Sequence, residues 1–317
     1  DFTVTECDGS SFAVIAVNDG TAGDNQILLT VASLTTATQS IRVTYINNNG
    51  FVKDLQGNDL ATDAQGVSFP IIVGAFDLST AVYAGDAARF APAPTSLSPH
   101  DVHFSHDGMK MFLVRAFEKK VMEYSLSAPY QILGAAYAGE QEDLTVTEPF
   151  SPVDVEFSND GMRMYLLGSG TSSIREYALV APYDVSTATA TGAIIHPIND
   201  WFAFNIFGLT FNDTGSKLFM GAIDTDKIYT YHLSTNFDLS TATKGSVSES
   251  LDVTPYDDTV TDFAFSADGK TLMILGTKTL KAYQLHLTVP YDLSTAVNAL
   301  KSLDISTQDN APIGLAF

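Results

Sequence analysis

Short stretches of alternating apolar and polar residues, separated by polar turns, fill the chain. Between Val153 and Phe157 the apolar positions alternate with Asp154 and Glu156, which is the two-residue period of a β-strand with one buried face. The other apolar runs of the same stretch cover 164–167, 174–179 and 187–195. No segment in this part of the chain keeps a 3.6-residue period over the length of a helix. The pattern therefore predicts an all-β protein in which these four runs form four strands.

A turn motif, in its clearest form Phe-Ser-x-Asp-Gly, recurs at intervals of about 54 residues, which indicates a repeat architecture. Its copies are Val102–Gly108, Val155–Gly161, Leu209–Gly215 and Phe263–Gly269, and Leu315–Phe317 begins a further one. Asp or Asn followed by Gly accepts positive φ angles at little cost. Each copy therefore predicts a hairpin turn between the first two strands of a unit, and we assign it a structural role.

A second motif, Tyr-Asp-Leu-Ser-Thr-Ala, keeps the same interval. Its copies are Phe76–Ala81, a degraded Tyr130–Leu133, Tyr183–Ala188, Phe237–Ala242 and Tyr291–Ala296. Two interleaved motifs with four short strands per unit are typical of a β-propeller, in which each blade buries its faces against its neighbours. We expect five or more blades, because four complete units and one blade assembled from both ends of the repeat region give five. A closed ring is favoured over an open array, because closure leaves no unpaired sheet edges.

The expected domains follow from the repeat. Residues 71–317 are assigned to the propeller, with complete blades at about 97–150, 151–205, 206–259 and 260–311, and a partial blade from 71–96 and 312–317. Residues 1–70 differ, with strands predicted at 2–5, 12–17, 27–31, 41–45 and 67–71. That pattern indicates an N-terminally truncated immunoglobulin-like β-sandwich. We expect the chain to be a window cut from a longer protein.

Two resemblances add to this assignment. Ile41–Tyr45 and Val52–Ala61 resemble the end of bacterial Ig-like repeats of the SwmB type, which occur in tandem on large surface proteins. Phe157–Tyr165 and Glu176–Ala188 resemble repeats of marine phage virion structural proteins and of bacterial surface proteins. These resemblances imply an extracellular location, at a cell surface or on a virion.

Charge and cysteine content exclude several classes of function. The 317 residues include 16 Lys and Arg against 37 Asp and Glu, a formal net charge of −21. Nucleic acid and anionic membrane surfaces are therefore not expected partners. No apolar run is long enough to cross a bilayer, and the single Cys7 excludes an internal disulfide.

No familiar catalytic motif is present: the chain lacks GxSxG, a P-loop, HExxH and GxGxxG. We therefore expect no catalytic residue and no enzyme activity. Glu123 and Glu176 occupy equivalent places in the third strand and are aligned here with Thr230 and Ala282, which indicates local structure more than a catalytic pair.

Three carboxylates recur at matching positions of the first strand of a unit. These residues are Asp101, Asp154 and Asp262, and Gly208 interrupts the series. The first strand of a propeller blade lines the central channel, so the carboxylates predict a site for Ca²⁺, which prefers oxygen ligands. The alternative is a channel that holds only water.

Loops that differ between units predict the binding surface, because loops that stay alike serve the scaffold. The richest of these connections holds Asp200, Trp201 and Phe202, whose aromatic rings suit stacking on a sugar. The alternative is a hydrophobic plug against the next blade. Further candidates on the same rim are Tyr256, Asp257, Asp258 and Arg115.

The expected function is a non-catalytic structural or adhesion module of a large surface or virion protein, such as a tail fibre. Its rim would bind a surface glycan, a protein receptor or other subunits of an appendage. Two alternatives stay open: a polysaccharide-active propeller enzyme, glycosidase or lyase, with its acids on the rim, and a purely structural protein–protein joint.

Overall fold

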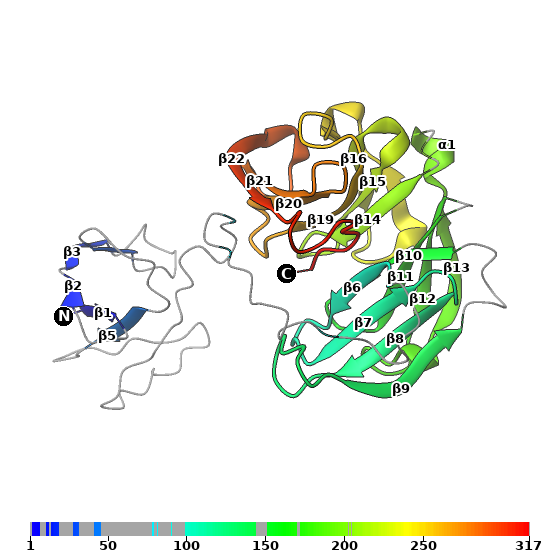
Figure 1. The fold of residues 1–317 in the computed structure, drawn as a ribbon, viewed down its shortest axis with the longest axis horizontal. Coiled ribbons are helices and arrows are strands. Elements are labelled where there is room, and N and C mark those ends of the chain that lie inside the picture. The colour runs from blue at the N-terminus through cyan, green and yellow to red at the C-terminus, as the bar shows by residue number, and fades with distance from the viewer. Residues whose placement is uncertain are drawn as a thin grey trace. The chain divides into compact units, whose positions relative to one another are not determined.

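The computed structural model of this chain describes residues 2–6, 11–12, 14–18, 28–31, 41–45, 78, 81, 90, 99–143, 151–169, 172–201, 203 and 205–316. The chain divides into two compact units, Asp1–Ala75 and Phe76–Phe317 (Figure 1). No helix in the described ranges is long and apolar enough to span a membrane.

The first unit is built from short antiparallel strands. They are β1 (Phe2–Glu6), β2 (Ser11–Phe12), β3 (Val14–Asn18), β4 (Leu28–Val31) and β5 (Ile41–Tyr45). One sheet has the order β2-β1-β5, and β3 pairs with β4 in another. The strand predicted at 67–71 and the motif at 52–61 lie outside the described residues.

The second unit consists of four antiparallel sheets, each built from consecutive strands. Blade 1 contains β6 (Asp101–Phe104), β7 (Lys110–Arg115), β8 (Lys120–Ser125) and β9 (Ala136–Asp143). Blade 2 contains β10 (Ser151–Phe157), β11 (Arg163–Ser169), β12 (Ser173–Ala178) and β13 (Thr189–Ile195). Blade 3 contains β14 (Ile206–Phe211), β15 (Lys217–Ala222), β16 (Lys227–Leu233), β17 (Ala242–Lys244) and β18 (Leu251–Asp252). Blade 4 contains β19 (Val260–Phe265), β20 (Thr271–Gly276), β21 (Lys281–Leu287) and β22 (Ala296–Asp304).

Within residues 99–316, the helical segments that the structure describes are short. They are α1 (Pro197–Trp201) and the 3₁₀ turns η3 (Val185–Thr187), η4 (Ile223–Thr225), η5 (Leu239–Thr241), η6 (Val247–Glu249) and η7 (Leu293–Thr295). The first strands of neighbouring sheets contact one another, β6 with β10, β10 with β14 and β14 with β19. The sheets are therefore arranged as propeller blades around an axis lined by first strands, and the predicted all-β propeller is confirmed (Figure 1).

Aromatic residues of the turn motif hold adjacent blades together. The Phe157 ring of blade 2 packs on Phe112 of blade 1, with centroids 4.5 Å apart. The equivalent pairs Tyr165–Phe211 and Phe219–Phe265 are each 4.7 Å apart. Burying such a side chain contributes roughly 1.5–3 kcal/mol each. The motif therefore recurs in blades 2, 3 and 4 because each of them presents the same aromatic contact to the blade before it.

The two sequence motifs meet in each blade. The Tyr183 N–H donates to the Gly161 carbonyl at 2.8 Å, and the Tyr183 ring covers Gly161. Gly161 has a φ of +68°, and a Cβ there would lie 2.3 Å from Tyr183 Cδ2. The corresponding pairs are Gly108 with Tyr130, Gly215 with Phe237 and Gly269 with Tyr291. The predicted structural role of the Asp-Gly turn is thus confirmed, and only glycine fits there.

Segments from both ends of the second unit pack on blade 4. The Leu78 N–H donates to Gln284 Oε1 at 2.9 Å, just as the Leu239 N–H of blade 3 donates to Glu176 Oε2 of blade 2 at 2.8 Å. The Leu315 N–H donates to Asp262 Oδ2 at 2.6 Å. Figure 1 shows the C-terminus in the middle of the four sheets.

Strand pairing corrects one sequence alignment. Tyr165 lies opposite Glu176 in blade 2, and Met273 lies opposite Gln284 in blade 4. Gln284, and not Ala282, is therefore the counterpart of Glu176, and its amide oxygen accepts the same kind of hydrogen bond from a neighbouring backbone N–H.

Candidate functional site at the central cavity

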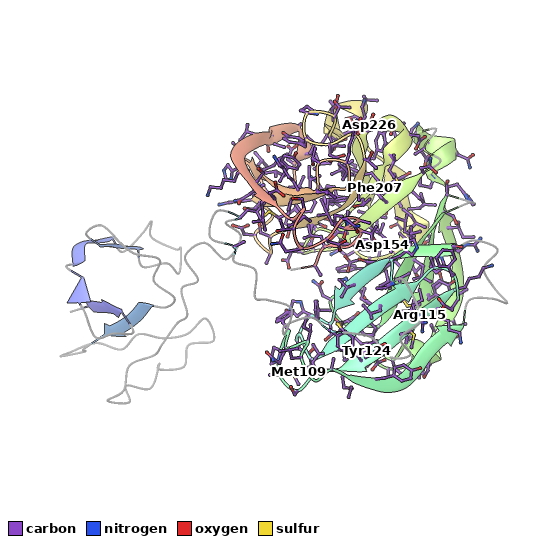
Figure 2. The ribbon with its side chains drawn as sticks, viewed as in Figure 1. Met109, Arg115, Tyr124, Asp154, Phe207 and Asp226 are labelled. Atoms are coloured by element: carbon purple, nitrogen blue, oxygen red, sulfur yellow. The ribbon has the colours of Figure 1, made fainter. Side chains whose placement is uncertain are left out.

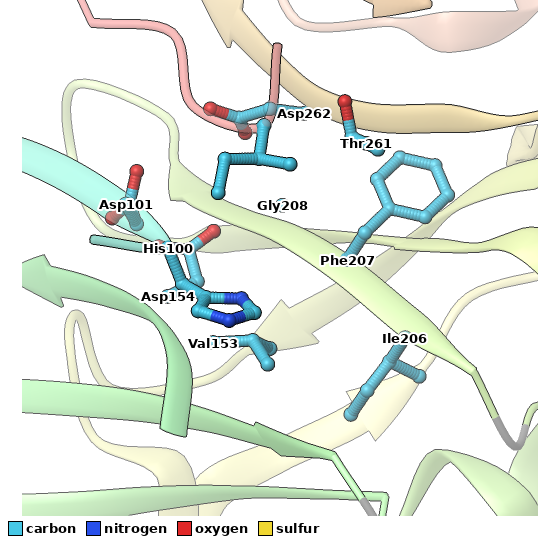
Figure 3. Close-up of a pocket in the computed structure, with 10 residues that line it drawn as sticks. His100, Asp101, Val153, Asp154, Ile206, Phe207, Gly208, Thr261 and Asp262 are labelled. Atoms are coloured by element: carbon cyan, nitrogen blue, oxygen red, sulfur yellow. The ribbon is translucent and has the colours of Figure 1, made fainter. Parts of the chain in front are cut away.

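A cavity of 220 Å³ opens among the first strands of the four blades (Figure 3). Its lining consists of His100, Asp101, Val153, Asp154, Ile206, Phe207, Gly208, Thr261, Asp262 and Ile313. The lining includes the three aligned aspartates Asp101, Asp154 and Asp262, Gly208 at the matching position of blade 3, and residues that come just before these positions in the chain. The cavity therefore lies toward the ends of the strands where the variable connections enter. Figure 2 places Asp154 near the middle of the ring and Met109 at its periphery.

The three aspartates first of all connect blades. Asp101 Oδ2 accepts the Val155 N–H of blade 2 at 3.2 Å. Asp154 Oδ2 accepts the Leu209 N–H of blade 3 at 2.6 Å. Asp262 repeats this contact with Leu315, as described above, and its Oδ1 also accepts the Phe263 N–H at 2.7 Å. Each carboxylate therefore satisfies a buried backbone donor of the following segment.

Gly208 interrupts the series because the next blade fills its place. A Cβ at Gly208 would lie 2.6 Å from Cδ1 of Phe263, and Gly208 has a φ of +55°. The residue aligned with Phe263 is smaller in the other blades, namely Val102, Val155 and Leu209. The Phe263 ring thus occupies the space of a fourth carboxylate. The larger residue at this position of blade 4 was the signal in the sequence that could have predicted the replacement.

Asp101 and Asp154 form a coupled acid pair. Their carboxyl groups share a hydrogen bond, and burial raises the pKa of both. The pKa of Asp154 is held well above its usual range by burial and then by the negative charges of Asp101 and Asp262. Two adjacent buried carboxyls do not both ionise readily, so the pair retains one proton, with Asp154 as the acid and Asp101 as the carboxylate.

A second layer of titratable groups lies two residues farther along the same strands. His103 Nε2 and Glu156 Oε1 are 3.2 Å apart. Burial raises the pKa of Glu156 to about 8 and lowers the pKa of His103 to about 4. Both side chains are therefore neutral near pH 7. Burial also lowers the pKa of His100 in the cavity wall, which leaves it a neutral imidazole that can donate one hydrogen bond.

The expected calcium site does not fit this arrangement. Asp101 and Asp154 retain a proton between them, and Asp262 accepts a backbone N–H on each oxygen. Within the described ranges, no group of three His, Cys, Asp or Glu side chains is disposed to hold a metal ion.

Trp201 and Asp200 lie away from the cavity lining, at the end of α1. The Tyr229 ring stacks on Trp201 with centroids 4.5 Å apart, and Lys244 Nζ lies over the indole at 5.4 Å. Asp200 Oδ2 accepts the Tyr231 hydroxyl at 3.1 Å. These contacts correspond to the plug alternative, with the indole packed on blade 3. Phe202 lies outside the described residues.

The remaining rim candidates are engaged in local structure. Asp257 is buried, and it accepts the Thr259 N–H at 2.7 Å and the Thr279 N–H at 2.8 Å. Asp258 forms an exposed ion pair with Lys278. Tyr256 packs on Tyr283, with centroids 5.8 Å apart.

Arg115 is buried at the end of β7 (Figure 2). Its Nη2 donates to Glu118 Oε1 at 3.1 Å and its Nη1 lies 2.9 Å from Met122 Sδ. The structure therefore does not bring Arg115, Trp201 and Asp257 together in one site. His100 is a cavity residue that the sequence did not predict, although its place just before Asp101 at the start of β6 was a signal for it.

No family model matches the chain, and no curated protein matches it, so the two family resemblances stay predictions. Among solved structures it is similar to a functionally unknown protein from Desulfotomaculum acetoxidans, with 15% identity, a TM-score of 0.41 and coverage of 65% of this chain and 56% of that one. The chain thus spans little more than half the length of that protein.

Two further similar structures carry enzyme names. One is a 6-phosphogluconolactonase candidate from Bacteroides uniformis, with 14% identity, a TM-score of 0.45 and coverage of 93% of this chain and 71% of that one. The other is a periplasmic gluconolactonase from Pseudomonas aeruginosa, with 16% identity, a TM-score of 0.43 and coverage of 96% and 82%. At these identities no residue role is transferred to this chain.

This finding corrects the expectation that the chain is not an enzyme. That expectation rested on the absence of familiar motifs, yet structures similar to this chain include a named gluconolactonase. Catalytic groups on a propeller come from strands far apart in sequence, so a short motif does not reveal them.

Proposed function

We propose that the second unit is a hydrolase that opens a small, neutral cyclic ester of the sugar-lactone class in its central cavity. The observation that carries the proposal is the Asp101–Asp154 pair, two buried carboxyls that share a hydrogen bond in the cavity wall. An acid and a base side by side are the two groups that water attack on a carbonyl requires.

The reaction uses both members of the pair. The Asp101 carboxylate takes a proton from a water molecule, and the water oxygen forms a bond to the carbonyl carbon of the lactone. Asp154 gives its proton to the carbonyl oxygen. When the ring C–O bond breaks, the proton on Asp101 passes to the leaving ring oxygen, and Asp154 recovers its proton as the carboxyl group forms. One lactone and one water thus give one hydroxy acid, and the pair returns to its starting state.

The geometry favours ester over glycoside hydrolysis. Glycosidases separate their two carboxyls by about 5–5.5 Å or 6.5–9.5 Å, because the sugar ring or a water stands between them. Here the two carboxyls contact each other directly. Within the enzyme alternative, acyl transfer to water therefore takes the place of glycosidic cleavage. A lactone hydrolase, and not an adhesion module, is the leading assignment.

The cavity also limits the substrate. None of its lining residues is Lys or Arg, while Asp101 supplies negative charge, so a phosphorylated sugar would be repelled. Its volume of 220 Å³ lies below the range of about 300–1,000 Å³ for sites of drug-sized ligands, which suits a single sugar ring.

Acid release from glucono-1,5-lactone and from its 6-phosphate tests the proposal. The wild-type chain is expected to hydrolyse the neutral lactone faster than background and faster than the phosphate. Asp154→Asn is expected to lower kcat by about 10²–10⁴-fold. The fold is retained, because the Asn oxygen still accepts the Leu209 N–H.

Asp292→Asn is the matched control, because this partly exposed turn carboxylate makes local hydrogen bonds to Ser294. Wild-type rates that stay at background for neutral lactones, or rates that Asp154→Asn leaves unchanged, would overturn the proposal.

A further inference from the structure

An exposed aromatic ring stands beside the cavity. Phe117, in the connection between β7 and β8, is 80% exposed, the most exposed aromatic side chain in the described part of the propeller. Its ring meets His100 edge-on, with centroids 6.1 Å apart and an interplanar angle of 71°. His100 lines the cavity next to Asp101. Phe117 therefore contacts the residue that comes directly before Asp101, one member of the proposed acid pair.

The packing of the blades does not account for Phe117. The phenylalanines that join blades 1 and 2 are buried, with Phe112 at 0% and Phe157 at 4% exposure. The corresponding connections of the other blades, 168–173, 223–227 and 276–279, contain no aromatic residue. The ring is thus a feature of blade 1 alone, and leaving it in water gives up the free energy that burial would provide.

The backbone that carries Phe117 is held in place. Buried Arg115 starts the connection, and its guanidinium contacts Glu118 and Met122 on the two sides of the hairpin, as described above. The Lys119 N–H donates to the Ala116 carbonyl at 3.3 Å, and the His100 N–H donates to the Val114 carbonyl at 2.9 Å. Arg115, a ligand candidate from the sequence, thus positions the hairpin and does not face the cavity.

We propose that Phe117 is a platform for a second sugar ring, so that the preferred substrate is the lactone of a disaccharide. This inference rests on the proposed function. The cavity has room for one ring, and the next ring of the substrate would leave it beside His100. The C–H face of a pyranose packs on an aromatic ring through dispersion and loss of apolar surface from water.

The test compares cellobiono-1,5-lactone with glucono-1,5-lactone on the wild type and three variants. Phe117→Ala is expected to lower kcat/KM for the disaccharide lactone by about 3- to 10-fold, through KM, and to leave the monosaccharide lactone within about twofold. Phe117→Trp restores the preference. Val180→Ala is the control, because Val180 is also 80% exposed but lies in the connection after β12. Equal effects on both lactones, or no effect, overturn the proposal.

A binding measurement separates this inference from the proposed function. Cellobiose has no reacting group of the lactone type, so saturation-transfer NMR with cellobiose detects the platform even if no lactone is hydrolysed. Transfer that is present in the wild type and lost in Phe117→Ala supports the platform. Absence of transfer in the wild type, or transfer that Phe117→Ala leaves unchanged, contradicts it.

Discussion

The carboxylate of Asp154 in blade 2 accepts the backbone N–H of Leu209 in blade 3 at 2.6 Å, across 55 residues of sequence. The same carboxyl group shares a hydrogen bond with Asp101 in the cavity wall. One side chain therefore joins two blades and forms half of the proposed acid pair. Its surroundings explain both roles, because a buried backbone donor needs an acceptor and burial keeps the carboxyl protonated.

Replacing Asp154 by Ala or by Asn separates these roles. Ala leaves the Leu209 N–H buried without an acceptor, which costs about 1–3 kcal/mol, whereas the Asn oxygen keeps the hydrogen bond. We expect Asp154→Ala to be less stable than Asp154→Asn by that amount in urea unfolding, with kcat lowered in both variants. Equal stability of the two variants would show that the hydrogen bond does not hold the blades together.

Two glycines with positive φ test the contact between the Asp-Gly turn and the aromatic residue of the second motif. Gly161 lies under the Tyr183 ring, while a Cβ on Gly192, with a φ of +88°, would meet nothing within 4 Å. Gly192→Ala should cost about 1–2 kcal/mol of backbone strain. Gly161→Ala should cost about 1–3 kcal/mol more, because the methyl group overlaps the ring. Thermal unfolding of both variants measures the difference, and a smaller loss for Gly161→Ala would contradict the contact.

Glu156 makes stability depend on pH. Its pKa is raised by burial from 4.5 to about 8, so the folded chain holds a proton that the unfolded chain releases between these values. Its contribution to stability is present at low pH and is lost as pH rises through this window. His103, with its pKa lowered by burial from 6.5 to about 4, acts in the opposite direction between those values. The decline due to Glu156 is therefore expected between pH 6.5 and 8.

Glu156→Gln is expected to remove this decline, because the amide has no proton to release while its oxygen still accepts the Phe157 N–H, which lies 2.8 Å from Glu156 Oε1. The free energy of unfolding, measured in urea at pH 6.5 and pH 8, should favour the variant more at pH 8. An advantage that does not grow with pH would show that Glu156 is already ionised in the folded chain.

The acid pair predicts a bell-shaped pH profile for lactone hydrolysis. Activity falls at low pH when Asp101 also gains a proton and at high pH when Asp154 loses its own. The negative charge of Asp262 contributes to the raised pKa of Asp154, so Asp262→Asn should move the alkaline limb to lower pH. Profiles of kcat/KM for both chains give the comparison, and an unmoved alkaline limb would remove Asp262 from the electrostatics of the site.

The candidate site was only partly visible in the sequence. The alignment of Asp101, Asp154 and Asp262 followed from the repeat, because each occupies the same place in its own unit. The hydrogen bonds that join different units could not be predicted, because in each of them the donor lies about 54 residues from the acceptor. Trp201 and Asp257 were predicted to bind a ligand from their residue types and loop positions, but in the structure both make local contacts.

The sequence by itself determined the architecture of the repeat: strands from the two-residue alternation and turns from Asp-Gly, since these preferences act over a few neighbouring residues. Tertiary structure alone decided which carboxyls share a proton, why Gly208 has no side chain, and that Phe117 stands beside His100. The shared proton and the space at Gly208 depend on distances between blades whose equivalent residues are about 54 positions apart in the chain, and on the loss of water between them. The contact of Phe117 with His100 depends on how two loops of blade 1 meet, which no local pattern encodes.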